Sequence, residues 1–371
     1  MSAQASLNYV TNQVTINGET KTINSLIEKF EEYIALSTFK ISEDTFSVSI
    51  ENYLLLNQTN LPSHTMDVTL DYVCRNRQAM LKRVNEDYVK DEDASTVTEK
   101  LQKIDFKRKL KEHQLSGLST MLTNPNSANF SVPGAGKTTV AIALNDLLDF
   151  KYTIIIVPNK QIIDNAWLPD MKDCLSDYSK HETFVIEGGS VKIERILKDF
   201  RETGGYAFIT YAQSPKVGHL LKKFMIHQET HLILDESHHM KGAIAERYNQ
   251  QSLQGMAVLD LALYAKRRDI LTGTPMPQGV YDIASQFEFL YPYCGISNQI
   301  IDNPQNPGVA IKGYWTRTTK SHMKNDLPKT ITHDPIGVEM SDKQYLFYDM
   351  VISRYKLIYT LLRRNQMFGD I

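Results

Sequence analysis

Short apolar runs alternate with segments of helical periodicity over most of the chain after residue 105. Five of these runs are rich in β-branched and aromatic residues, as buried strands are: residues 152–158, 183–188, 206–211, 231–237 and 267–275. Strands and helices that alternate in this order predict a parallel sheet covered by helices on both faces. Because ligands bind at the carboxyl ends of such strands, the residues that end each run are the candidates for chemistry.

The first hundred residues follow a different pattern. Residues 9–23 alternate apolar and polar positions around Asn17-Gly18, which predicts a β-hairpin. The other elements expected here are helices over 25–36 and 69–89 and a strand over 45–56. Together they predict a small α+β domain. Residues 90–100 are charged and polar, so they are the predicted linker to the rest of the chain.

Composition and charge narrow the class of protein. The chain has 371 residues, of which 42% are apolar, enough for two or three domains with cores of their own. Its formal charge of -2 is not that of a strongly basic nucleic-acid-binding protein, so any basic surface that binds nucleic acid must be local. No apolar run approaches the roughly 18 residues of a membrane span, and no secretory signal is recognised. Cys74, Cys174 and Cys294 lie far apart, so neither a disulfide framework nor a metal knuckle is expected, and we expect a cytoplasmic protein.

A glycine-rich segment, SVPGAGKT at residues 131–138, nearly fits the phosphate-loop pattern G-x-x-x-x-G-K-[ST], with Ser131 in place of the first glycine. Gly134 and Gly136 let the backbone turn its N–H groups toward a phosphate. Lys137 would lie between the β- and γ-phosphates, and Thr138 would offer its hydroxyl to Mg²⁺. The predicted nucleotide-binding residues here are Pro133, Gly134, Ala135, Gly136, Lys137, Thr138 and Thr139. The alternative is an ordinary glycine turn before a core helix.

Two further strand ends carry residues that suit a magnesium nucleotide. Asp235 would hold Mg²⁺ together with Thr138, and Glu236 would align or deprotonate the attacking water. Thr272 and Thr274 follow another strand, where their hydroxyls could touch both the γ-phosphate and the carboxylate pair. Taken alone, the acidic pair could equally belong to a solvated turn between a strand and a helix. The threonine segment alone could be an ordinary turn. Their order after the phosphate loop favours an ATP site with Lys137, Asp235 and Glu236 as its catalytic residues.

The order of these segments resembles a known family. HQLSGL, GAGKTT, IVPNKQIIDNAW, FITYAQ, DESHH and LTGTPMPQGVYDIASQFEFLYP are similar to the motifs of superfamily-two helicase-like ATPases, above all the Swi/Snf-type DNA translocases. Residues 315–350 resemble the bridge that these enzymes place before their second lobe. The resemblance runs from about residue 105 to 371. It implies a RecA-like P-loop fold at 101–312, after an accessory α+β domain at 1–100, with 313–371 leading toward a second RecA-like lobe.

The resemblance also implies roles for individual residues. Gln114 stands where these enzymes recognise adenine, and His238 fills the histidine position of the D-E-x-H box. Thr272 and Thr274 belong to the coupling motif. The segments at Pro158 and at Thr210-Tyr211 would contact the nucleic-acid backbone.

The implied activity is ATP hydrolysis with Mg²⁺, coupled to movement on double-stranded DNA, in a setting such as genome defence or repair. No motif of the second lobe is recognised, so we expect either a fragment of a longer protein or a lobe supplied by another chain. Since that lobe carries the arginine finger, the chain alone should hydrolyse ATP slowly.

Two alternatives remain open: an RNA or single-strand helicase, and a nucleotide-binding scaffold or sensor whose residues 1–100 recruit an effector such as a nuclease. Three basic clusters, at 107–111, 222–223 and 266–268, are either solvated faces or contacts to a nucleic-acid backbone. His231, His238 and His239 could suggest a metal, but the D-E-x-H box accounts for His238 without one.

Overall fold

The structure is a computed structural model that describes residues 3–33, 39–40, 42–57, 64–85, 91–244, 251–323 and 334–364. The chain divides into two compact units, Met1–Asn325 and Asp326–Ile371. The first unit contains two separate sheets, and the second contains the helix α13 (Asp342–Arg364). Among the described residues, no helix combines the length and the apolar character that crossing a membrane requires.

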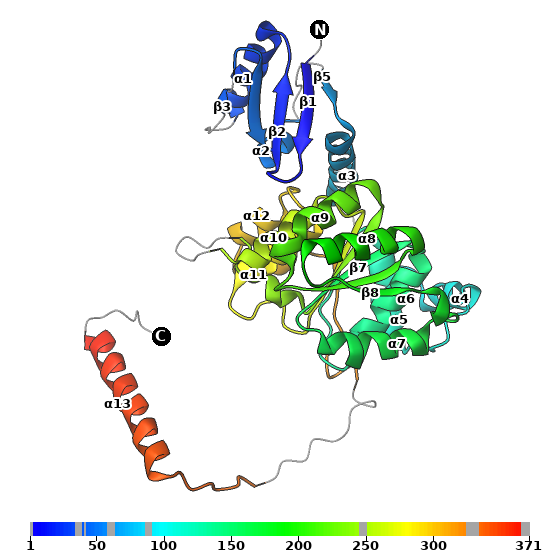
Figure 1. Ribbon diagram of the computed structural model, residues 1–371. Coiled ribbons are helices and arrows are strands. Elements are labelled where there is room, and N and C mark those ends of the chain that lie inside the picture. The colour runs from blue at the N-terminus through cyan, green and yellow to red at the C-terminus, as the bar shows by residue number, and fades with distance from the viewer. Residues whose placement is uncertain are drawn as a thin grey trace. The chain divides into compact units, whose positions relative to one another are not determined.

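The N-terminal part of the first unit is a small α+β domain, as predicted (Figure 1). Its five strands lie in the order β3-β4-β2-β1-β5, and only β1 and β5 pair in parallel. The strands are β1 (Ala3–Asn8), β2 (Gln13–Asn17), β3 (Phe39–Lys40), β4 (Thr45–Ser49) and β5 (His64–Met66). The helices are α1 (Thr20–Tyr33), α2 (Ile50–Leu56) and α3 (Val68–Asn85). Two of them, α1 and α3, overlap the helices expected over 25–36 and 69–89, of which residues 34–36 and 86–89 lie outside the described ranges.

The hairpin predicted around Asn17-Gly18 is wrong, and a different hairpin lies just before it in the chain. β1 pairs with β2 through a turn at residues 9–12, where Asn12 adopts the positive φ of 54° that a tight turn needs. Asn17 ends β2 instead, and α1 begins at Thr20. Gly18 has a packing role here, because a Cβ at this position would lie 2.9 Å from the Cα of Ala3.

Two other segments differ from the sequence prediction. The strand expected over 45–56 ends at Ser49, whose hydroxyl accepts the N–H of Asn52 at 3.3 Å and so begins α2. The expected linker is largely α4 (Ala94–Lys103), which buries Val97 and Leu101, while Lys90 lies outside the described residues. Capping by Ser49 therefore ends the strand early in the first segment. In the second, the burial of Val97 and Leu101, one turn apart, favours a helix.

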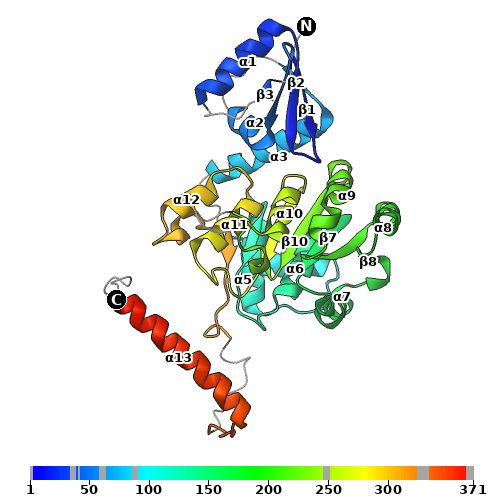
Figure 2. The ribbon, with the colours of Figure 1, turned by 60° about the vertical axis from the view of Figure 1, so that its left-hand side comes forward.

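The second sheet has seven strands, all parallel, in the order β12-β6-β11-β10-β7-β9-β8, which confirms the RecA-like α/β fold (Figure 2). The strands are β6 (Ser127–Asn129), β7 (Tyr152–Val157), β8 (Thr183–Val185), β9 (Gly205–Thr210), β10 (Thr230–Asp235), β11 (Arg267–Leu271) and β12 (Trp315–Thr316). All five strands predicted from the sequence are present. The short β6 and β12 were not predicted.

Helices cover both faces of this sheet and bury two separate cores. Along β7, Ile154 and Ile156 belong to one core, whereas Ile155 and Val157 belong to the other. Such alternation explains the continuous apolar run, since both faces are buried. One face carries α5 (Glu112–Thr123), α6 (Lys137–Leu148) and α7 (Leu168–Cys174). The other carries α8 (Ser190–Thr203), α9 (Ser214–His227), α10 (Leu253–Ala262) and α11 (Val280–Leu290), with α12 (Ile296–Asp302) beside α11.

The N-terminal domain packs on the RecA-like lobe through buried cations. The guanidinium of Arg77 in α3 donates to the carbonyl of Tyr293 at 2.7 and 3.0 Å and to the carbonyl of Leu54 at 2.8 Å. Lys222 of α9 donates to the carbonyl of Tyr9 at 2.8 Å and pairs with Asp260. These contacts join the two sheets of the first unit by charge-assisted hydrogen bonds, which are the stronger kind.

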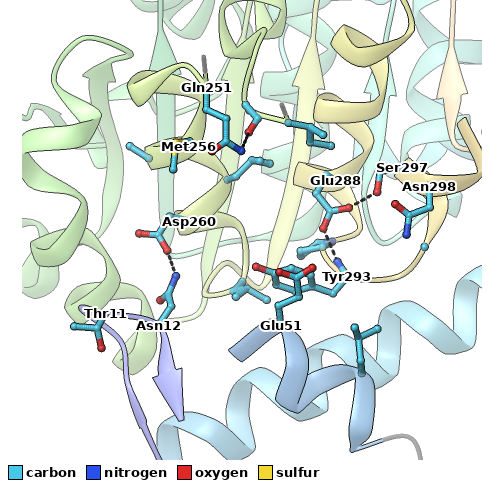
Figure 3. A pocket seen from close by; sticks show the side chains of 18 of the residues that line it. Thr11, Asn12, Glu51, Gln251, Met256, Asp260, Glu288, Tyr293, Ser297 and Asn298 are labelled. Atoms are coloured by element: carbon cyan, nitrogen blue, oxygen red, sulfur yellow. Dashed lines mark hydrogen bonds between the residues drawn. The ribbon is translucent and has the colours of Figure 1, made fainter. Parts of the chain in front are cut away.

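A cavity of about 720 Å³ lies at this junction (Figure 3). Carboxylates line it from both sides: Glu51 comes from α2, Asp260 from α10 and Glu288 from α11. Each of the two lobe carboxylates is already bound, Asp260 to Asn12 and Glu288 to the hydroxyl of Ser297. None of the predicted nucleotide-site residues lines this cavity, so it is separate from the site described next.

Candidate nucleotide site

The glycine-rich segment forms a turn between β6 and α6, and α6 begins at Lys137. Gly134 and Gly136 have φ values of 82° and 80°, which glycine adopts with little cost. A Cβ at Gly136 would lie 2.2 Å from Nε2 of Gln114, so a larger residue there would also have to displace the end of that side chain. The turn therefore places the N-terminus of a 12-residue helix at the loop that follows β6, and a helix N-terminus attracts anions.

Ser131, the departure from the strict pattern, has a contact of its own. Its hydroxyl accepts the backbone N–H of Thr318 at 2.9 Å, just beyond β12. Its carbonyl accepts a hydrogen bond from the ammonium of Lys137 at 3.1 Å. Burial lowers the pKa of Lys137, and the negative charges of Glu236 and Asp235 oppose that shift. The charges of the acid pair therefore act on the ammonium of Lys137.

Asp235 ends β10 and is 7% exposed. Its Oδ2 accepts the indole N–H of Trp167 at 2.8 Å, and its Oδ1 accepts the backbone N–H of Glu236 at 3.0 Å. Burial raises the pKa of Asp235, while the Trp167 bond and the charge of Lys137 lower it. These donors favour the ionised carboxylate that a metal ion needs.

Glu236 leaves the strand with φ 49° and ψ 54°, a left-handed conformation that costs energy for a residue with a Cβ. Its Oε2 lies 3.2 Å from Nδ1 of His238 and accepts the hydroxyl of Thr272 at 3.4 Å. The same Nδ1 lies 2.9 Å from Oγ1 of Thr272 and 3.3 Å from Oγ1 of Thr274. The turn after β10 and the threonine segment after β11 thus meet around one histidine.

Gln114 and Pro133 also lie at the loop. Gln114 donates from Nε2 to the carbonyl of Ala135 at 3.2 Å, and its Oε1 accepts the N–H of Lys111 at 2.9 Å. Pro133 packs against the coupling segment, since a Cβ at Gly273 would lie 2.9 Å from its Cδ. Thr138 occupies the first turn of α6. The structure therefore brings Gln114, the loop, the acid pair and the threonine segment together.

Thr139 lies in the same helical turn, and its side chain contacts Asp170 and Arg108. Its hydroxyl donates to Asp170 of α7 at 3.1 Å and accepts a hydrogen bond from Arg108 at 2.9 Å. Arg108 also pairs with Asp170 at 2.9 Å and with Asp173 at 2.8 Å. Thr139, 2% exposed, thus holds α6 against α7, and its Oγ1 would lie 3.8 Å from a Cβ placed on Gly136 of the loop.

Two residues of the site, Trp167 and Gln286, were given no role by sequence reasoning, and Tyr211, expected in a segment that contacts nucleic acid, has a contact to the acid pair that was not predicted. Trp167 supports Asp235, and Tyr211 donates its hydroxyl to the carbonyl of Asp235 at 3.0 Å. Gln286 accepts from the hydroxyl of Ser237 at 2.7 Å and donates to the carbonyl of Pro275 at 2.7 Å, which joins the acidic turn to the threonine segment. Both aromatic residues lie inside segments that carry the family resemblance, and that was the one signal available.

Several basic residues of the proposed clusters are buried, so they are neither solvated nor available to a nucleic acid. Lys222 is 2% exposed and binds Asp260. Arg267 pairs with the buried Asp269 at 2.6 Å, and Arg268 donates to carbonyls of α10 and α11. His231, 0% exposed, lies between Asn145 and Asp269. Within the described ranges, no group of three histidine, cysteine, aspartate or glutamate side chains is arranged to hold a metal ion.

The parallel sheet and the glycine-rich turn define a P-loop ATPase lobe of the RecA type. The family model of the SNF2-related domain matches residues 5–368, so the chain belongs to this family, the Swi/Snf-type branch of superfamily-two helicase-like ATPases. The chain is also 27% identical over 295 residues to Helicase domino of Drosophila melanogaster. That alignment covers 70% of this chain but 8% of the relative, so the chain spans a small part of that protein's length.

Proposed function

We propose that this chain binds ATP with Mg²⁺ at the Lys137–Asp235–Glu236 site and couples hydrolysis to movement on double-stranded DNA. The observation that carries the ATP site is that the strand-end segments meet beside the loop: Thr272 donates to Glu236 at 3.4 Å, and Gly273 packs against Pro133. The negative charges of Asp235 and Glu236 also act on the ammonium of Lys137. Gln114 would contact adenine, and the loop from Pro133 to Thr138 would hold the phosphates. Membership of the SNF2-related family supports ATP hydrolysis and nucleic-acid binding.

The donor set fits a magnesium ion. Asp235 and the hydroxyl of Thr138 are hard oxygen ligands, and Mg²⁺ commonly takes one or two such groups, keeping waters and substrate phosphates for the rest. Asp235 and Thr138 would hold the ion, which would supply positive charge to offset the negative charge on the phosphates. Trp167 keeps Oδ2 of Asp235 in place, and the carboxylate of Glu236 would accept the proton of the attacking water.

The nucleic-acid surface is proposed for the same edge of the sheet. Pro158 follows β7 and Thr210-Tyr211 ends β9, so both segments lie at carboxyl ends of adjacent strands. Lys107, Lys109 and Lys111 are exposed and precede α5. Double-stranded DNA is the substrate that the Swi/Snf-type resemblance favours, with genome defence or repair as the setting. We also propose that the chain alone turns over slowly, because an arginine finger from a second lobe is worth about 10³–10⁵ in rate.

A phosphate-release assay with Glu236→Gln tests this function. The wild-type chain should release phosphate slowly, more with duplex DNA than without. Glu236→Gln should still bind Mg-ATP by calorimetry but release none. Stimulation by RNA or single strands but not by duplex would favour the helicase alternative. Failure of the wild-type chain to bind ATP would overturn the proposal, and fast turnover by the isolated chain would overturn the need for a finger.

A further inference from the structure

Tyr211 connects the proposed DNA-contacting segments to the acid pair. Its N–H donates to the carbonyl of Val157 at 3.1 Å, directly before Pro158. Its hydroxyl donates to the carbonyl of Asp235 at 3.0 Å, and the side chain is 1% exposed. This one residue, directly after β9, therefore contacts the end of β7 through its backbone and the end of β10 through its buried side chain. Any displacement of these strand ends relative to each other must move this residue.

A stack of three aromatic rings continues from Tyr211 to the site. The ring of His239 stacks on Tyr211 with centroids 5.5 Å apart and an interplanar angle of 29°. The ring of His238 lies 4.7 Å from that of His239 at 30°. Nδ1 of His238 is the group that contacts Glu236 and Thr272. The rings of Tyr211, His239 and His238, here called the ring stack, thus end at the proposed water-activating carboxylate.

We propose that Tyr211 and His239 are positioning residues that couple nucleic-acid binding to the Glu236 carboxylate. This inference rests on the proposed function of the same site. Coupling between two sites needs groups that change arrangement together, and rings that are in contact pass a displacement of one to the next. The D-E-x-H box accounts for His238 but not for His239, which would otherwise be an exposed turn residue without a function.

The experiment measures how a bound nucleotide changes affinity for DNA. In the wild-type chain, duplex affinity is determined by fluorescence anisotropy with and without a non-hydrolysable ATP analogue and Mg²⁺. We expect the two affinities to differ by about 5–150-fold, the usual range of coupling between sites. His239→Ala should bind the nucleotide by itself and the duplex by itself with affinities within about twofold of wild type. The ratio of the two duplex affinities, with and without the analogue, should nevertheless fall toward one. A merely structural role would change the separate affinities instead.

Variants keep the test specific. His239→Phe retains a ring for stacking and should restore most of the ratio, whereas His239→Gln should not. Tyr211→Phe keeps the ring but loses the bond to the Asp235 carbonyl, so its ratio should be intermediate. His219→Ala changes an exposed histidine on α9 and should match wild type. Thermal denaturation confirms that each variant is folded.

The outcomes separate this inference from the proposed function. If the wild-type chain binds neither nucleotide nor DNA, the proposed function fails and the coupling fails with it. If it binds both without coupling, or if His239→Ala keeps the wild-type ratio, the inference alone is overturned and the ATP site stands.

Discussion

The indole of Trp167 donates its N–H to Oδ2 of Asp235 at 2.8 Å, although the two residues lie 68 positions apart in the chain. Trp167 ends a π-helical turn, Ile163–Trp167, and is 0% exposed. Because burial raises the pKa of Asp235, this donor helps to keep the carboxylate ionised. The acid proposed to hold Mg²⁺ therefore depends on an aromatic residue from a different element.

Replacing Trp167 by Phe should weaken the binding of Mg-ATP. The ring remains, but Oδ2 of Asp235 loses its donor, which costs about 1–2 kcal/mol and so about tenfold in affinity. Isothermal titration calorimetry with Mg-ATP measures the change. Trp315→Phe alters the other tryptophan of the chain and serves as the control. Equal affinities for wild type and Trp167→Phe would show that the indole does not support the metal ligand.

Replacing Ser131 by Gly restores the strict phosphate-loop pattern, yet we expect it to destabilise the protein. The Thr318 amide loses its acceptor at a site where Ser131 is 4% exposed, at a cost of about 1–3 kcal/mol. Urea unfolding measures the loss, and faster hydrogen exchange at Thr318 locates it. Ser131→Ala removes the same acceptor without adding backbone freedom. If only the glycine variant is destabilised, backbone freedom and not the hydroxyl is responsible.

The sequence was sufficient to predict the central strands, because burial on both faces leaves an uninterrupted apolar run. β7 and β10 are such strands. β6 could not be predicted, since Ser127 and Asn129 make two of its three residues polar. Ser127 is accommodated in the core by a hydrogen bond from its hydroxyl to Asp269 at 2.7 Å, a partner 142 positions away. Pairings of this length leave no local pattern.

The candidate site shows the same division. Glycines that need positive φ, a lysine and a strand-terminal acid pair have local signatures, so their positions follow from the sequence. Trp167 was assigned no role, and the contact of Tyr211 with Asp235 was not predicted, because both side chains act through tertiary contacts. The bonds of Thr139 to Asp170 and Arg108 join segments far apart in the chain, so no sequence pattern indicated them. Sequence charge likewise gave no indication that Arg268 is buried.

Replacing Arg77 by Met should destabilise the first unit markedly. Arg77 is 4% exposed, and its loss leaves the carbonyls of Tyr293 and Leu54 without their charged donor, which costs about 3 kcal/mol. The free energy of unfolding in urea measures this. Arg75→Met is the matched control on the same helix, because Arg75 is exposed and pairs only at the surface with Asp71. Equal stability of both variants would mean that Arg77 does not join the two sheets.

Replacing Asp146 by Asn should stabilise the protein at high pH but not in acid. Burial raises the pKa of Asp146 from 3.8 to about 6, and the negative charge of Asp149 makes a smaller contribution in the same direction. The folded protein thus binds this proton more tightly than the unfolded chain does, so stability falls as pH rises from 3.8 and the penalty is complete above about 6.

At about pH 8 the amide removes that penalty, and we expect a gain of about 1 kcal/mol after solvent screening. Urea unfolding between about pH 4.5 and pH 8 should show the gain growing up to pH 6 and constant beyond it. Asp199→Asn, on the exposed face of α8, should show no such dependence. A gain that is constant across the range would mean that the amide acts through packing and not through the raised pKa of Asp146.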